Sequence, residues 1–127
     1  MTIAAVTVFT VLVGHALFDW VLQTRKMAET KCNLRTGFWL HILVYAIGLL
    51  CMVATVNVLA MLFATPVQLS LAWVIANIHA HALVDAVTSQ ITSRAWVKKR
   101  TKLFWNTIGI DQMIHYICLF GSTFIGL

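Results

Sequence analysis

The sequence predicts an all-α fold, an integral membrane four-helix bundle that forms a single domain over residues 1–127. Two observations predict it. First, 61% of the residues are hydrophobic and only 10% are charged, whereas a soluble domain carries about 25% charged residues. Second, the apolar residues form four segments, each long enough for the roughly 20-residue helix that crosses a bilayer. The helices are expected at about residues 3–23, 37–64, 67–94 and 104–127.

The first two apolar segments have lengths that bear on this prediction. Residues 3–22 are too long and too apolar for the core of a signal peptide, and no cleavage pattern of small residues is evident. We therefore expect a retained transmembrane helix there. The second segment is longer than a bilayer requires, which predicts a tilt or an extramembrane end before the turn at Thr65 and Pro66.

All nine basic residues lie in two places, which are two of the connecting segments together with the last residue of the third predicted helix. Cytoplasmic loops are rich in Lys and Arg, so both segments are expected on the cytoplasmic side of a bacterial inner membrane, with both termini extracytoplasmic. The same rule explains the net charge of +5 without nucleic acid. Basic loops also attract anionic membrane lipids, and at a cytoplasmic mouth they could gather a phosphorylated substrate. These residues are Arg25, Lys26, Lys31 and Arg35, then Arg94, Lys98, Lys99, Arg100 and Lys102.

Three of the apolar segments each contain a histidine and an aspartate four residues apart. On an α-helix this spacing places both side chains on one face, one turn apart. The remaining segment carries His41 and Tyr45 at the same spacing. All these residues lie at similar distances from the basic loops, so we expect them in one layer of the bundle. The three pairs are His15 with Asp19, His81 with Asp85, and Asp111 with His115.

This layer predicts a metal site. Ionisable residues in membrane helices are costly and face the bundle interior, and three clustered carboxylates cannot all stay ionised without compensation. One or two divalent ions, zinc or manganese, would compensate them, with a bridging aspartate if there are two. The alternative is that His–Asp hydrogen bonds join the helices or relay protons without metal. The expected ligands are His15, Asp19, His41, His81, Asp85, Asp111 and His115.

Other polar residues near the layer have weaker predictions. Asn77 lies four residues before His81 and shares its helix face, whereas His79 points about 200° away. Gln23 and Gln112 are expected to orient ligands or to line the mouth of the site. The three cysteines form no C-x-x-C pair and predict neither a disulfide framework nor a thiolate site.

Four stretches resemble a known family. They are residues 14–24 (GHALFDWVLQT), the helix start at His41, residues 81–85 (HALVD) and residues 110–115 (IDQMIH). Together they resemble small bacterial and bacteriophage inner-membrane proteins of unknown function, whose pattern opens with H-x-x-x-D-F-x-L-Q and closes with D-Q-x-x-H. The chain is similar, more loosely, to inner-membrane proteins described as metal-dependent hydrolases. The resemblance implies a four-helix membrane protein and leaves its activity open.

This chain departs from the family pattern at two positions. Tyr45 stands where the family often has a second histidine, and Trp20 replaces the usual phenylalanine. The first departure bears directly on the predicted ligand set.

The function expected first is that of an intramembrane metal-dependent hydrolase. Its substrate would be a phospholipid or a lipid-linked phosphate near the cytoplasmic leaflet. Asp19, Asp85 and Asp111 would act in catalysis as ligands or proton carriers, and Tyr45 could donate a hydrogen bond to the substrate.

Two other functions stay open from the sequence. One is a divalent-metal or proton binding or transport protein, although few polar residues lie beyond the layer and a pore would require a homo-oligomer. The other is a membrane interaction protein without catalysis.

Overall fold

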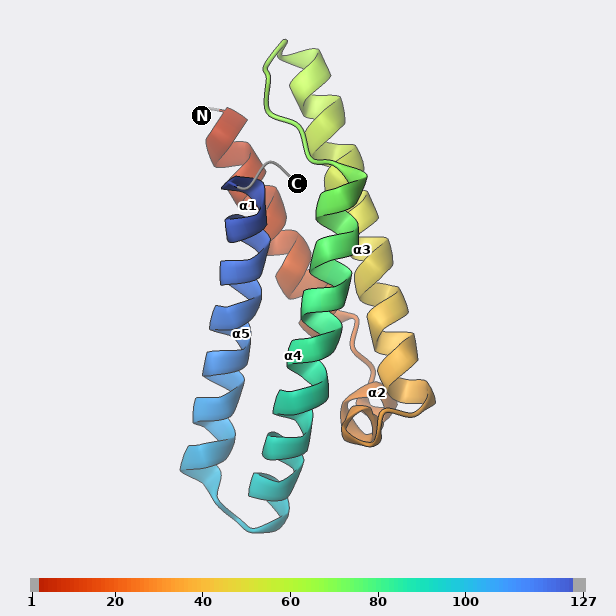
Figure 1. Cartoon of the computed structure of the whole chain (residues 1–127), viewed down its shortest axis with the longest axis vertical. Helices are drawn as coiled ribbons and strands as arrows, with labels where there is room; N and C mark the ends of the chain where they lie inside the picture. The colour runs from red at the N-terminus through yellow and green to blue at the C-terminus, as the bar shows by residue number, and fades with distance from the viewer. Residues whose placement is uncertain (1–2, 125–127) are drawn as a thin grey trace.

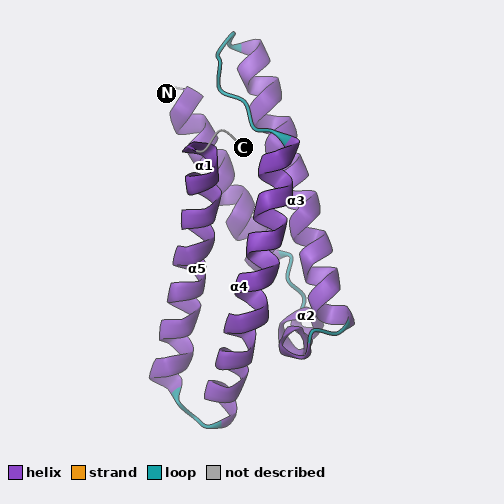
Figure 2. Ribbon diagram, in the orientation of Figure 1, coloured by secondary structure: helices purple, strands orange, loops and turns teal. Residues whose placement is uncertain are grey.

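The computed structural model describes residues 3–124, and its regular elements are all helical (Figures 1 and 2). Five α-helices are joined by short turns, one of which is a π-helical turn and one a 3₁₀ turn. In chain order they are α1 (Ile3–Ala16), the π turn η1 (Leu17–Val21), α2 (Arg25–Thr30), the 3₁₀ turn η2 (Lys31–Asn33), α3 (Thr36–Leu62), α4 (Leu71–Val97) and α5 (Thr101–Phe124).

The four long helices run side by side along the long axis of the molecule (Figure 1). α1 packs against α3, α3 against α4, and α4 against α5. The start of α1 and the end of α5 lie toward one end, whereas α2 and the turn between α4 and α5 lie toward the other. Both basic segments of the sequence are therefore in the same half of the molecule.

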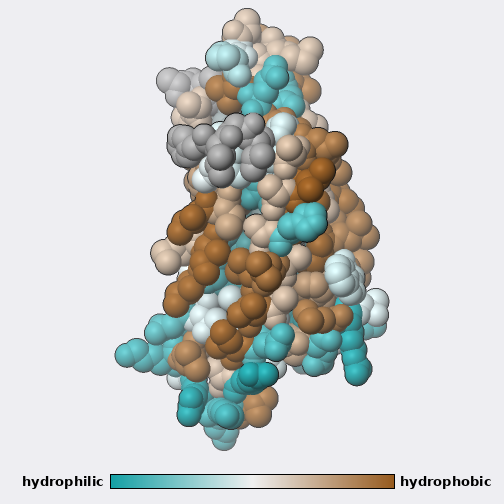
Figure 3. All heavy atoms as spheres, in the orientation of Figure 1, coloured by the Kyte–Doolittle hydropathy of each residue, from teal (hydrophilic) through white to brown (hydrophobic). Residues whose placement is uncertain are grey.

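Three helical segments are long and apolar enough to cross a membrane: Ala4–Val21, Thr36–Leu62 and Leu71–Val97. Among the described residues, α5 does not meet the same measure, because Asp111, Gln112 and His115 lower its hydropathy. Hydrophobic side chains cover much of the middle of the visible face, and hydrophilic ones gather at the end that holds the α4–α5 turn (Figure 3).

An apolar core fills the space between the helices, toward the end of the molecule where α1 begins and α5 ends. Trp73 is fully buried there, and its indole N–H donates to the carbonyl oxygen of Leu119 at 3.1 Å, joining α4 to α5. The cluster consists of Val11, Tyr45, Leu49, Met52, Val56, Leu69, Trp73, Val74 and Leu119.

The prediction that the third long helix begins at residue 67 is wrong, since α4 begins at Leu71. The side chain of Asn57 on α3 pairs with both backbone groups of Leu69, at 2.9 Å each, and holds this segment outside the helix. Ser70 then caps α4 by accepting a hydrogen bond from the N–H of Trp73 at 3.0 Å.

The other predicted boundaries shift by a few residues. α3 ends at Leu62 rather than 64, α4 extends to Val97 rather than 94, and α5 begins at Thr101 rather than 104. Left-handed backbone conformations at Ala64 and Lys99 follow the ends of α3 and α4, as is common after helix C-termini. The predicted end at residue 127 lies outside the described residues.

The first helix and the first basic segment also differ from the prediction. The regular α-helix ends at Ala16, and the chain continues as the π turn η1 to Val21 rather than as one helix to residue 23. The basic segment after it is not simply a loop, because α2 and η2 form within it. Thr24 begins α2 by accepting a hydrogen bond from the N–H of Met27 at 3.3 Å.

Candidate metal centre

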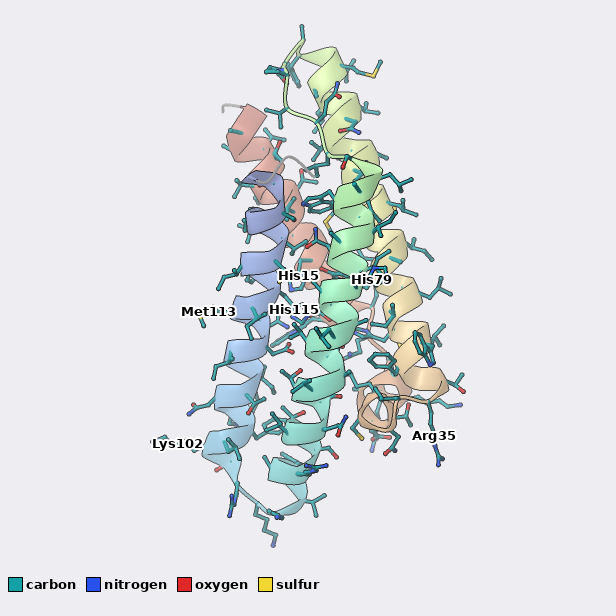
Figure 4. All side chains as sticks on the ribbon, in the orientation of Figure 1. His15, Arg35, His79, Lys102, Met113 and His115 are labelled. Carbon is teal, nitrogen blue, oxygen red and sulfur yellow. The ribbon has the colours of Figure 1, made fainter. Side chains whose placement is uncertain are left out.

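The seven residues predicted as ligands meet in the interior between the long helices. Each has an exposed fraction of 8% or less. They form three overlapping groups, and within each group one potential ligand atom per residue lies within 4.8 Å of the others. The groups are Asp19, His41, His81 and Asp85; His15, Asp19 and His115; and Asp85, Asp111 and His115. Figure 4 shows His15 and His115 close together in this interior.

The four residues of the first group, which we call the central group, converge from η1, α3 and α4. Nε2 of His41 lies 3.1 Å from Oδ1 of Asp19, 3.0 Å from Oδ2 of Asp85 and 3.1 Å from Nε2 of His81. Nε2 of His81 lies 3.7 Å from each of the same two carboxylate oxygens. Two imidazole nitrogens and two carboxylate oxygens therefore surround one point.

These separations are close to the spacing of ligands around a tetrahedral ion. With metal–ligand bonds of about 2.0–2.2 Å, the ligand atoms of a tetrahedral zinc site lie about 3.3–3.6 Å apart. Three of the five separations are 3.0–3.1 Å and two are 3.7 Å, all within about 0.3 Å of that range. Two histidines and two aspartates are also a donor set that zinc accepts.

Hydrogen bonds between neutral groups account poorly for the same convergence. A neutral imidazole carries one N–H, yet Nε2 of His41 has three neighbours within 3.1 Å. The other ring nitrogen, Nδ1, lies 3.4 Å from the side-chain amide of Gln23. The arrangement needs either extra protons on the histidines or aspartates, or a cation among the four atoms.

Gln112 on α5 ties the central group to the residues beside it. Its amide N–H group donates to Oδ2 of Asp19 at 2.9 Å and to Oδ2 of Asp111 at 3.1 Å. Its amide oxygen lies 3.1 Å from Nε2 of His15. Asp19 thus directs one oxygen into the central group and the other toward Gln112 and His15, as a bridging carboxylate would.

Several buried polar atoms around His115 have no hydrogen-bond partner among the described residues. They include both ring nitrogens of His115, Nδ1 of His81 and Oδ1 of Asp85. Nδ1 of His115 lies 3.5 Å from Oδ2 of Asp111. Buried polar groups are nearly always satisfied, so these atoms are free to act as ligands to a metal ion or to bond to water.

Tyr45 lies in the same layer and is buried, with 1% of its surface exposed. Its ring stacks on that of His81, with centroids 3.7 Å apart, and its hydroxyl lies 3.3 Å from Nδ1 of His15. The catalytic role expected for Tyr45 stays a prediction. The structure itself assigns Tyr45 contacts that fix the orientation of two histidine rings.

Asp19 reaches the central group from the π turn. The N–H of Leu22 donates to the carbonyl oxygen of Leu17 at 2.9 Å, which closes a turn one residue wider than an α-helical turn. Such turns are frequent at functional sites. Phe18 precedes Asp19 and lies against Gly48 of α3, where a Cβ atom would come within 2.3 Å of the ring.

Lys31 is the main contributor that the sequence interpretation missed. Its Nζ lies 3.1 Å from Oδ2 of Asp85, a contact that the sequence does not predict, because the basic segments were expected to set the topology and to attract anionic lipids or a phosphorylated substrate. Thr88 donates to Oδ1 of Asp111 at 2.5 Å. Ser89 is buried four residues after Asp85, and its hydroxyl has no partner among the described residues.

Two other polar residues of α4, Asn77 and His79, lie outside the histidine–aspartate cluster. Asn77 donates to the carbonyl oxygen of Trp73 at 2.8 Å and to Oγ of Ser122 at 2.9 Å, so it joins α4 to α5. His79 is exposed, as its spacing predicts, and its Nδ1 lies 2.7 Å from the carbonyl oxygen of Ile75.

A cavity of about 320 Å³ leads from the surface to the cluster. Asp19, Asp111 and Gln112 form its polar wall, and Lys31 and Ser89 also line it. Its larger apolar lining residues are Trp20, which is 56% exposed, and the partly buried Phe104 and Ile108. We call this space the η1–α5 pocket; its lining is completed by Gln23, Ala28, Thr88 and Thr92.

The fold and the buried cluster define an all-helical protein with candidate membrane spans and histidine–aspartate groups that could hold a metal. The chain belongs to the family described as "Protein of unknown function (DUF3307)", whose model matches residues 7–124. This match fits the resemblance to an uncharacterised family. No curated protein and no solved structure matches the chain.

Proposed function

We propose that the chain is an intramembrane metal-dependent hydrolase that acts on a phospholipid or a lipid-linked phosphate near the cytoplasmic leaflet. The observation that carries the proposal is the convergence of His41, His81, Asp19 and Asp85 at ligand–ligand distances of 3.0–3.7 Å in the buried interior, beside the η1–α5 pocket that Asp19 also lines. Asp111 and His115 of the cluster lie on α5. The proposal therefore places α5 in the bilayer beside the three candidate spans, as the fourth helix of the bundle.

The central group and its neighbours suit different tasks. The central group offers four protein ligands, as closed structural zinc sites do, whereas catalytic sites keep a position free for substrate or water. The groups that contain His115 offer three ligands each. Of their members, Asp19 and Asp111 also line the η1–α5 pocket, so a second ion beside His115 would be the one that meets a substrate.

A divalent ion in the second position would lower the pKa of a bound water and polarise a phosphoryl oxygen. The protein's own residues would then position the groups around it. Gln112 holds Asp19 and Asp111 in fixed orientations through two hydrogen bonds. Asp111 can also accept a proton at the mouth of the pocket, where Thr88 donates to its other oxygen.

A transport function uses the same residues but needs a polar path onward through the protein. Beyond the cluster, the described helices pack the apolar side chains of Leu49, Met52, Val56, Trp73 and Leu119. This packing favours hydrolysis over transport. Metal flux into proteoliposomes that disappears in Asp85→Ala would reverse that preference.

The test of the proposal is hydrolysis of a lipid phosphate by purified protein with and without divalent metal. Zinc or manganese should restore activity after removal of metal by a chelator. Asp111→Asn should reduce kcat by at least about 100-fold, as loss of a general acid–base group does. Activity that is indifferent to chelator and to Asp111→Asn would reject the proposal.

A further inference from the structure

The η1–α5 pocket combines features of a binding site that the metal ligands alone do not explain. The backbones of η1 and α5 do not pack closely within the described residues; α5 packs instead on α4 and η1 on α3. The side chains of Asp19 and Gln112 bridge this separation. The remaining space of about 320 Å³ is at the lower end of the usual range for small-ligand sites, about 300–1,000 Å³.

Two polar groups in the pocket are able to donate hydrogen bonds to a ligand. Lys31 supplies an ammonium group whose side chain is 20% exposed, and Asp85 occupies only one of its three donor positions. Ser89 is 4% exposed, lines the pocket and has a hydroxyl without a partner in the described part of the chain. A cationic donor beside a neutral donor is suited to an anionic oxygen group.

The charge of the cluster determines when an anion would be attracted. Asp19, Asp85 and Asp111 contribute three negative charges, and Lys31 contributes one positive charge. With neutral histidines, one divalent ion makes the cluster neutral, and two leave it with two positive charges. A phosphate ester then meets complementary charge, and this step rests on the proposed function.

The larger apolar residues that line the pocket indicate what the phosphate is attached to. Trp20 is 56% exposed at the end of the first candidate membrane span, and Phe104 and Ile108 lie across the pocket on α5. Tryptophan concentrates at the membrane interface, where its ring sits at the level of the lipid head groups. An acyl chain can contact these side chains while its phosphate reaches Lys31.

We propose that the η1–α5 pocket binds the phosphate group of a membrane lipid that enters sideways from the bilayer. Lys31 and Ser89 donate to the phosphate oxygens, and Trp20, Phe104 and Ile108 contact the adjoining chain. Lys31 is then a specificity-determining residue, in addition to its contact with Asp85.

The experiment measures equilibrium binding by calorimetry to full-length protein in a maltoside detergent. The probe is the dioctanoyl phosphonate analogue of phosphatidic acid, which resists hydrolysis. Inorganic phosphate and dioctanoylglycerol are the two comparison ligands, since each keeps one half of the probe. Metal content is measured by mass spectrometry on every sample.

Lys31→Gln should weaken binding of the probe by at least about tenfold, and Ser89→Ala by about threefold, as the usual contributions of charged and neutral hydrogen bonds imply. Lys31→Arg should retain binding because it keeps the charge. Lys26→Gln is the matched control: it removes one positive charge from the same segment at an exposed position outside the pocket, and should leave the dissociation constant unchanged. Trp20→Ala should weaken binding of the lipid probe but not binding of inorganic phosphate.

Equal losses in Lys31→Gln and Lys26→Gln would overturn the proposal, because general charge attraction would then account for binding. Inorganic phosphate binding as tightly as the lipid probe would overturn the lipid assignment. If Lys31→Gln and Ser89→Ala both leave the affinity of metal-loaded protein for the lipid probe unchanged, the pocket is rejected. The metal centre is not affected by that result. Lys31- and Ser89-dependent binding by protein that holds no metal would reject the hydrolase and the part of the metal in attracting the phosphate, while supporting Lys31 and Ser89 as the groups that bind it.

Discussion

Asp85 is the residue where the metal and hydrogen-bond explanations differ most sharply. It is fully buried, and one of its oxygens lies within 3.1 Å of both His41 and Lys31. Asp85→Asn keeps the shape of the side chain but removes its charge and weakens ligation. If the cluster holds metal, the variant should lose metal and melt several degrees lower, because a ligand at about 100 times its Kd stabilises the folded state by about 2.7 kcal/mol.

Melting curves in detergent, with and without chelator, measure this effect. His79→Ala is the control, because His79 is exposed and lies off the cluster; its metal content should be unchanged. If hydrogen bonds alone join the helices, Asp85→Asn should be neutral or stabilising, and chelator should have no effect on its melting temperature.

The sequence identifies most of the cluster because ionisable residues inside apolar helices are rare and informative. The four-residue spacing selects the interior face of each helix, and all seven selected side chains are buried. The same argument could have identified Ser89, because it follows His81 and Asp85 at the same four-residue spacing and lies on the same helix face. It could not have identified Lys31, since the contact of Lys31 with Asp85 spans 54 positions and depends on how α2 and η2 fold.

At the scale of elements, the contact between η1 and α3 positions Asp19. Gly48→Ala places a Cβ atom within 2.3 Å of Cγ and 2.6 Å of Cβ of Phe18, atoms that are close to the backbone and cannot easily move. We expect a destabilisation of about 1–3 kcal/mol, as is typical of overpacking. Metal content should fall as well, because Phe18 precedes Asp19.

Gly14→Ala is the matched comparison, measured in the same denaturation experiment. Its Cβ would meet only the side chain of Met52, at 2.7–2.9 Å, and a flexible methionine can move aside. The loss of folding stability should be smaller than in Gly48→Ala. Replacing a helical glycine by alanine also adds about 0.5–1 kcal/mol of stability, which offsets part of the cost. Equal stability of Gly48→Ala and the wild type would show that Phe18 does not fix η1.

The element boundaries show where sequence patterns stop being sufficient. Residues 67–70 are apolar enough to continue a helix, yet Asn57 holds them outside α4 through hydrogen bonds across 12 positions. The π turn at Asp19 likewise has no periodicity signal of its own. Both features come from contacts between elements, which local hydropathy does not encode.

For the whole molecule, the arrangement of the helices predicts the orientation in the membrane. The basic segments lie toward the end opposite the terminal parts of the chain (Figure 1), so the positive-inside rule can be met by both at once. A reporter fused after Leu127 should be extracytoplasmic, and one inserted in the turn between α4 and α5 should be cytoplasmic. A cytoplasmic signal after Leu127 would contradict the inner-leaflet substrate without affecting the metal centre.

The central claim is that the buried histidine–aspartate cluster holds divalent metal, and metal content per chain tests it most directly. The protein should be purified without chelator and measured by mass spectrometry beside His81→Ala and His79→Ala. We predict one or two zinc or manganese ions per chain in the wild type and in His79→Ala, and a clear loss in His81→Ala. Wild-type protein with far less than one ion per chain, or His81→Ala with undiminished metal, would contradict the claim.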